Sequence, residues 1–96
     1  MSDVKRLARV PEGVMVREVQ GEAVLLHLDT GEYFGLDQIA TRIWQLIVEK
    51  KDLKAVEAAM CEEYDADPEV VAKDLRELVD ELVTKRILEV DVVDGR

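Results

Sequence analysis

One stretch of the chain, residues 21–47, constrains the fold more than any other. It reads GEAVLLHLDTGEYFGLDQIATRIWQLI and contains two apolar runs, a turn sequence, a helix cap and the only tryptophan. In the first run, residues 23–28, His27 is the one polar residue, which is typical of a strand covered on both faces. The Asp-Thr-Gly sequence that follows favours a turn, because aspartate suits the first position and glycine accepts positive φ. The stretch therefore predicts strand, turn, strand and helix, in that order.

The second strand of this stretch is short and has its own pattern. We expect it from Glu32 to Leu36, with Phe34 and Leu36 on one face and Tyr33 and Gly35 on the other. A glycine inside a strand often marks the close approach of another backbone. Gly35 is therefore of interest for function.

One more strand is expected before this stretch. Residues 14–19 alternate imperfectly, with Val14 and Val16 directed inward, and Gln20-Gly21 supplies the reversal into the next strand. Together with the two strands of the central stretch, this segment predicts an antiparallel meander.

The two ends of the chain carry weaker signals. Residues 1–12 lack periodicity and are interpreted as a loose N-terminal arm. Residues 87–93 fit either a last short strand or an extended tail, and residues 94–96 are expected to be loose. The chain of 96 residues is thus predicted to form a single domain over residues 13–93.

Three helices are expected after the meander, each beginning at an aspartate. Asp37 and Asp52 can cap the first two, and Asp67 followed by Pro68 is a strong start for the third. Trp44 lies in the apolar stripe of the first helix and is interpreted as a core residue. The third helix has an apolar arc wider than a small core requires. The members of this arc are Val71, Ala72, Leu75, Leu78, Val79, Leu82 and Val83.

This order of elements predicts an α+β fold. A three-stranded antiparallel sheet is followed by a three-helix bundle, with short connections. Winged helix-turn-helix topology is the nearest general description.

The charge balance argues against nucleic acid as a partner. Asp and Glu total 22 against 13 Lys and Arg, which gives a net charge of −9, and such a field repels phosphate backbones and anionic lipid heads. The N-terminus has no apolar run long enough for a signal peptide or a membrane span. One cysteine cannot form an internal disulfide, so we expect a cytoplasmic protein.

No catalytic, metal or cofactor motif is recognisable. Ser2 is the sole serine and has no supporting base, while Cys61 and His27 come from different elements with no local motif around either. A single cysteine and a single histidine do not make a structural zinc site. We therefore expect no catalytic residue, no metal and no cofactor, and a protein that is not an enzyme.

Several phrases of the sequence resemble the PqqD-like family. They are VLL at residues 24–26, DTGEYFGLD at 29–37, IWQL at 43–46, DLRELVDEL at 74–82 and RILEV at 86–90. The resemblance runs from about Gly13 to Val90 and rests on apolar patterns rather than on reactive residues. The phrase from residue 30 to the tryptophan is more similar to stand-alone members from lasso-peptide and radical-enzyme gene clusters than to the pyrroloquinoline quinone pathway member.

The resemblance implies a peptide chaperone, also called a recognition element of ribosomally made and modified peptides. Such proteins bind the leader of a precursor peptide as an added strand beside the third strand and the third helix, and present it to a maturation enzyme such as a radical S-adenosylmethionine enzyme, a protease or a cyclase. Carried onto this chain, the peptide-binding residues are Glu32, Tyr33, Phe34, Gly35, Val71, Asp74, Leu75, Leu78 and Val79.

The residues themselves fit this assignment and leave two alternatives. An edge strand offers unpaired backbone groups, and a helix with surplus apolar width offers side-chain pockets. A winged-helix nucleic-acid binder has the same element order, but its recognition helix would carry Asp74, Glu77 and Asp80 where Lys or Arg is needed. A structural oligomerisation domain, such as a homodimer, could use the same edge and stripe.

Overall fold

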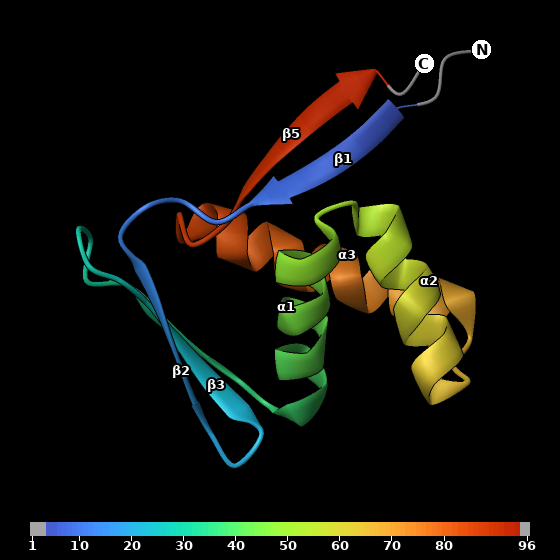
Figure 1. The fold of residues 1–96 in the computed structure, drawn as a ribbon, viewed down its shortest axis with the longest axis horizontal. Coiled ribbons are helices and arrows are strands. Elements are labelled where there is room, and N and C mark those ends of the chain that lie inside the picture. The colour runs from blue at the N-terminus through green and yellow to red at the C-terminus, as the bar shows by residue number, and fades with distance from the viewer. Residues whose placement is uncertain (1–3, 95–96) are drawn as a thin grey trace.

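The computed structural model describes residues 4–94, and within them the chain forms three helices, a three-stranded sheet and a two-stranded ribbon (Figure 1). The elements are, in chain order, β1 (Val4–Arg9), β2 (Val14–Val19), β3 (Glu22–His27), β4 (Tyr33–Leu36), α1 (Gln38–Lys50), α2 (Leu53–Tyr64), α3 (Pro68–Thr84) and β5 (Glu89–Asp94).

The three-stranded sheet is antiparallel, with the strand order β2-β3-β4. Gln20 and Gly21 form the loop between β2 and β3, both at positive φ, as a two-residue hairpin loop of type I′ requires. The expected turn after β3 is present, with Gly31 at φ +77° and its N–H donated to the carbonyl oxygen of His27 at 2.8 Å. The predicted meander is confirmed.

Aspartate begins each helix in the described part of the chain. The carboxylates of Asp37, Asp52 and Asp67 each accept a backbone N–H from the first turn of their helix, at 2.8 to 2.9 Å. Pro68 occupies the first turn of α3, where its missing N–H costs nothing because that group would have no helical partner. All three predicted helix starts are confirmed.

The core lies between one face of the sheet and the helices, which pack α1 on α2 and α2 on α3. Trp44 is 3% exposed, so its predicted core role is confirmed. Val16, in contrast, is 42% exposed, and the expectation that it points into the core is wrong. It belongs to the edge strand β2, whose residues after Val14 are all exposed.

An ion pair joins α1 to α2. The Arg42 Nε lies 2.9 Å from Glu63 Oε2, and this hydrogen bond lowers the pKa of the Glu63 carboxyl below its ordinary value. Glu63 stands in the last turn of α2, where an acidic side chain opposes the helix dipole. The arginine of the neighbouring helix compensates for that placement.

The N-terminal and C-terminal strands pair with each other. β1 and β5 form an antiparallel ribbon in which Val4 lies opposite Asp94 and Arg9 opposite Glu89, and Figure 1 shows the ribbon projecting from the helices. The expectation of a loose arm is therefore wrong for residues 4–9, and that of a loose end is wrong for Asp94. Residues 1–3 and 95–96 lie outside the described residues, and the domain limits 13–93 stay a prediction.

Ala8 attaches this ribbon to the helices. Its N–H donates to the carbonyl oxygen of Lys51 at 2.7 Å, and its side chain is 4% exposed. Arg9 also bridges the two strands, 2.6 Å from Glu89 and 3.3 Å from Asp91, but exposed ion pairs contribute little to stability. The strand forms because of contacts with residues far away in the sequence, and this is why local periodicity does not reveal it.

Candidate peptide-binding edge

β4 is an edge strand with one open side. Among residues 4–94, its strand partner is β3 alone. The N–H of His27 donates to the carbonyl oxygen of Glu32 at 2.8 Å, and in an antiparallel pair the residues that share ladder bonds alternate along each strand. This alternation directs the backbone groups of Phe34 toward β3 and those of Tyr33 and Gly35 toward the open side.

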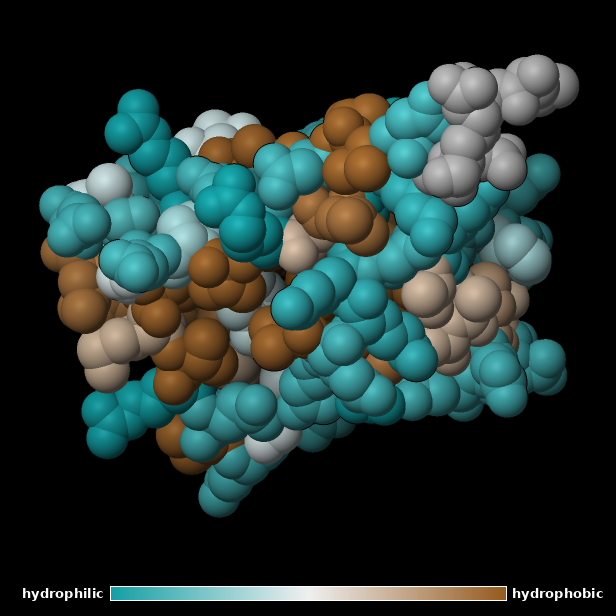
Figure 2. Space-filling model, turned by 45° about the horizontal axis from the view of Figure 1, so that its top comes forward, coloured by the Kyte–Doolittle hydropathy of each residue, from teal (hydrophilic) through white to brown (hydrophobic). Residues whose placement is uncertain are grey.

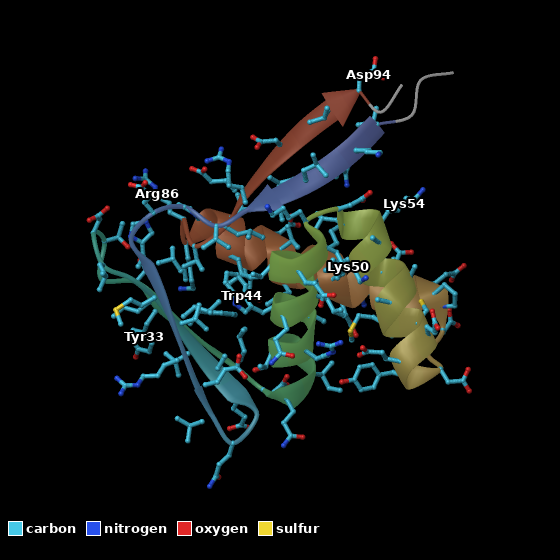
Figure 3. All side chains as sticks on the ribbon, in the orientation of Figure 1. Tyr33, Trp44, Lys50, Lys54, Arg86 and Asp94 are labelled. Atoms are coloured by element: carbon cyan, nitrogen blue, oxygen red, sulfur yellow. The ribbon has the colours of Figure 1, made fainter. Side chains whose placement is uncertain are left out.

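A shallow hollow of about 530 Å³ lies along this open side, and we call it the β4 hollow. Its lining consists of Thr30, Gly31, Glu32, Tyr33, Phe34, Gly35 and Lys85. A β-carbon placed on Gly35 would meet no atom within 4 Å, so the space beside this residue is open. Glu32 and the three β4 residues that the resemblance assigns to peptide binding therefore line one hollow, and Figure 3 shows Tyr33 on the side of the sheet away from the helices.

Lys85 closes the hollow from the side of α3. It is the C-terminal cap of that helix, its Nζ lies 3.4 Å from Glu32 Oε2, and the same atom lies 6.0 Å from the centre of the Phe34 ring. A cation at a helix C-terminus is favourable, and a cation over an aromatic face adds about 0.5–1 kcal/mol at an exposed site. Lys85 is not among the residues predicted from the sequence, because nothing in its local sequence shows that the end of α3 meets β4.

The α3 residues assigned to the groove fall into two groups. Val71, Leu75 and Val79 are buried in the core, at 7%, 5% and 7% exposure. Leu78 is half-buried and Asp74 is exposed. None of the five lines the β4 hollow, so the groove role of these residues stays a prediction, with Leu78 and Asp74 the most accessible to a ligand.

Thr41 fixes the other end of β4. This buried residue is 2% exposed, and its hydroxyl accepts the N–H of Ala23 at 2.9 Å while donating to the carbonyl oxygen of Leu36 at 3.3 Å. One side chain of α1 thus contacts the backbone of both β3 and β4. Helix α1 therefore stabilises the position of β4 through the backbone of its last residue, Leu36.

Apolar surface gathers on the sheet. Figure 2 shows hydrophobic side chains concentrated on the left half of the molecule, which Figure 1 identifies as the half with β2, β3 and β4. The exposed apolar residues of these strands and the following turn are Met15, Val16, Val19, Val24, Leu28 and Tyr33. Exposed apolar surface is typical of an interaction site, and the members nearest the open side of β4 are Tyr33 and Val24, which lies opposite Gly35.

The remaining surface bears on three kinds of partner: nucleic acid, a metal ion and a lipid bilayer. The exposed face of α3 carries Asp74, Glu77, Asp80 and Glu81, which would repel a nucleic acid. Within residues 4–94, no three His, Cys, Asp or Glu side chains come together as ligands of a metal ion would. Over the same range, every helix is too short or too polar to cross a lipid bilayer.

The fold and the edge define a small α+β domain of the winged helix-turn-helix-like class, as predicted. The family model of coenzyme PQQ synthesis protein D (PqqD) matches residues 22–88, which is more than half of the chain. This protein therefore belongs to the PqqD family, and the resemblance noted in the sequence is confirmed. The match includes β3, β4 and all three helices.

Two curated relatives agree with this membership. The chain is 36% identical over 91 residues to the PqqA binding protein of Rhizobium meliloti, covering 93% of this chain and 88% of that protein. It is 33% identical over 90 residues to the bifunctional coenzyme PQQ synthesis protein C/D of Methylorubrum extorquens, covering 92% of this chain. It spans 23% of that longer protein.

Two solved structures share the fold. One is TbiB1 in complex with the TbiA(beta) leader peptide, with a TM-score of 0.79 and 41% identity over 84% of this chain and 94% of that one. The other is lasso peptide synthetase B1 complexed with the leader peptide, with a TM-score of 0.76 over 85% of this chain and 96% of that one. At 23% identity, the second likeness shows the fold alone.

Proposed function

We propose that this protein is a peptide chaperone that binds the leader of a ribosomally synthesised precursor peptide. The leader adds as a fourth strand on the open side of β4, next to α3. The observation that carries this proposal is the β4 edge itself, where Tyr33 and Gly35 direct backbone groups away from the sheet into the β4 hollow. Strand addition satisfies these groups and fixes the register of the peptide.

The names of the relatives support leader binding, and strand addition at β4 is our proposal for its mode. One is named for binding PqqA, and a solved structure at 41% identity holds a leader peptide. In the proposal, backbone pairing supplies affinity that depends little on sequence. Pockets for alternate side chains beside α3, with Leu78 and Asp74 the accessible candidates, supply selectivity.

A proline substitution tests the edge. The N–H of Tyr33 faces the open side, so Tyr33→Pro removes a donor for the added strand without removing one from the β3 ladder. Val16→Pro is the matched control. The N–H of Leu28 donates to the carbonyl oxygen of Gly13, so Gly13 and every second residue after it bond to β3. The N–H of Val16 therefore points to the open side of β2. The measurement is titration of a fluorescent leader from the precursor encoded beside the gene, with circular dichroism of both variants.

The two variants have opposite expected results. Tyr33→Pro should weaken leader binding about tenfold, since a lost backbone bond is worth roughly 1–1.5 kcal/mol, and Val16→Pro should leave it unchanged. Equal affinities for the wild type and a folded Tyr33→Pro would refute strand addition at β4. Binding lost only in Val16→Pro would move the site to β2.

The partner completes the proposed role. A radical S-adenosylmethionine enzyme, a protease or a cyclase acts on the presented peptide, and the PqqD-like protein itself performs no reaction. The acidic surface, with a net charge of −9, steers a basic region of that enzyme. We place this role in the cytoplasm. If the open edges instead serve a homodimer, light scattering will show a mass that rises with concentration and does not change on adding leader.

A further inference from the structure

A second hollow, of about 490 Å³, also borders the C-terminal end of α3. Lys85 lines the β4 hollow and Arg86, the next residue, lines this one. We call it the His27 pocket. Its lining consists of Pro11, His27, Val83, Arg86, Leu88, Glu89 and Val90. The proposed strand addition does not use it.

His27 is the buried polar group of this pocket. It is the one histidine of the chain and is only 7% exposed. Its Nδ1 accepts the N–H of Asp29 at 3.2 Å, so the neutral ring carries its proton on Nε2. Nε2 donates to no residue in the range 4–94, and it is not among the fully buried side-chain nitrogens of that range. This donor is therefore unused and keeps some contact with the surface.

Arg86 brings a positive charge to the same pocket. Its side chain is exposed and forms no ion pair with any residue between 4 and 94. Figure 3 shows Arg86 beside the segment that joins β1 to β2, which contains Pro11. The one carboxylate of the lining, Glu89, is held by Arg9 at 2.6 Å. The pocket thus offers a free guanidinium and an imidazole donor.

The rest of the lining is apolar, so it favours a ligand with a hydrocarbon group beside its hydrogen-bond acceptor. Pro11, Val83, Leu88 and Val90 supply hydrocarbon walls, and Val83 is 42% exposed although it stands in the last turn of α3. A carboxylate matches the two donors, because charge-assisted bonds to guanidinium are strong and can be bidentate. An apolar neighbour of that carboxylate matches the walls.

We propose that the His27 pocket binds an Asp or Glu side chain of the precursor peptide, together with an adjacent apolar residue. This inference rests on the proposed function and adds a side-chain selection to it. Lys85 and Arg86 are consecutive residues, so the β4 hollow and the His27 pocket are lined from the same stretch of chain. The net charge of −9 opposes the approach of a carboxylate, so its binding depends on the Arg86 and His27 donors at short range, inside the screening length of about 8 Å.

Two small probes test the pocket without any leader. N-acetyl-Leu-Glu amide and N-acetyl-Leu-Gln amide differ only in the charge of one side chain, and the ¹H–¹⁵N resonances of Arg86 and the ring of His27 report on both. The expected result is saturable shifts with the Glu probe at millimolar concentration and an affinity about tenfold lower for the Gln probe. Equal responses to the two probes, or no response to either, would overturn the proposal.

Three variants assign the response to the pocket. Arg86→Gly should abolish the preference for Glu over Gln, His27→Phe should weaken binding, and His27→Gln, which keeps an N–H donor, should restore part of it. Lys51→Gly is the control, because Lys51 is another cation at positive φ, +64°, outside the pocket. A Glu preference that survives Arg86→Gly would overturn the proposal.

A leader titration on the same protein separates the two hypotheses. If the Glu probe binds and no leader shifts the β4 resonances, strand addition fails and the pocket stands as a carboxylate site. If the leader shifts β4 and neither probe shifts Arg86, the pocket proposal fails alone. Replacing the acidic residues of a bound leader by their amides should weaken it about tenfold in the wild type and not in Arg86→Gly.

Discussion

Arg86 donates its backbone N–H to the carbonyl oxygen of Val83 at 3.0 Å while it holds φ at +61°. With the N–H of Ile87 on the carbonyl oxygen of Leu82 at 2.9 Å, this arrangement is a Schellman motif, in which glycine is the usual residue at the left-handed position. An arginine there is strained by about 1–2 kcal/mol.

Arg86→Gly should therefore stabilise the fold. The substitution removes the backbone strain, but glycine has a larger conformational entropy in the unfolded chain, which offsets part of this effect. The free energy of unfolding should therefore rise by about 0.5–1 kcal/mol. Urea unfolding measures it, and Arg86→Ala, which keeps a β-carbon, should show no gain. A destabilised Arg86→Gly would mean that the side chain contributes more to the fold than its backbone strain costs.

Thr41→Val should destabilise the junction of α1 with the sheet. The substitution keeps the shape but leaves the N–H of Ala23, a residue only 1% exposed, without its acceptor. A buried donor without a partner costs about 1–3 kcal/mol. Chemical denaturation should show this loss, whereas Thr41→Ser, which retains the hydroxyl, should lose less. Equal losses in the two variants would assign the effect to the methyl group.

Lys85→Met should weaken leader binding more than it weakens the fold. The ion pair with Glu32, at 3.4 Å, is exposed and contributes at most about 1 kcal/mol to stability. Its loss also removes a charged donor from the β4 hollow, which should lower leader affinity about threefold to tenfold and reduce the salt dependence of binding. Lys54→Met, on the first turn of α2, is the control and should bind as the wild type does.

Leu75→Glu should affect the fold, whereas Leu78→Glu should affect leader binding. Leu75 is 5% exposed, so a glutamate there places an unpaired charge in the core and should unfold the domain. Leu78 is half-buried, so its variant should stay folded, as circular dichroism will show. If α3 lines the groove, the folded Leu78→Glu binds leader at least tenfold more weakly, since burying a leucine contributes about 1.5–3 kcal/mol. Unchanged affinity would remove Leu78 from the groove.

The Arg42 and Glu63 pair should make stability depend on pH in the acid range. The hydrogen bond from Arg42 lowers the pKa of Glu63 in the folded state, so the pair stabilises the fold above the unfolded glutamate value of about 4.3. This contribution is lost as pH falls through the lower folded value. The difference in Tm between the wild type and Glu63→Gln should thus shrink toward zero below about pH 4. A constant difference down to pH 2.5 would contradict the assignment.

The sequence predicted those parts of the fold that local signals determine. Aspartate caps, the Gln20-Gly21 reversal and the 29–31 turn act within a few residues, so β2 and all three helix starts lie where they were expected. The short strand β4 was expected with its faces in the observed alternation, because Phe34 and Leu36 are covered and Tyr33 and Gly35 are exposed. Local periodicity is sufficient for all of these.

Long-range contacts account for what was missed. β1 pairs with β5, 80 to 90 residues away. The segment of β1 was expected to be loose, and for residues 87–93 a last strand was one of two alternatives, because neither segment has an alternation that identifies it alone. Lys85 became part of the site because α3 ends beside Glu32. The His27 pocket was not predicted, because its lining comes from the connection before β2, from β3 and from the chain around the end of α3. Only the fold brings such residues together.

The register of the ribbon has a consequence for how the domain can be connected. Val4 faces Asp94 across the two strands, so both ends of the described chain emerge at the same corner, at the tip of the ribbon (Figure 1). A short linker between them would give a circular permutant with the same sheet and helices. A second protein tethered at either end would start from one point in space, and the length of its tether would then set its effective concentration at the β4 edge.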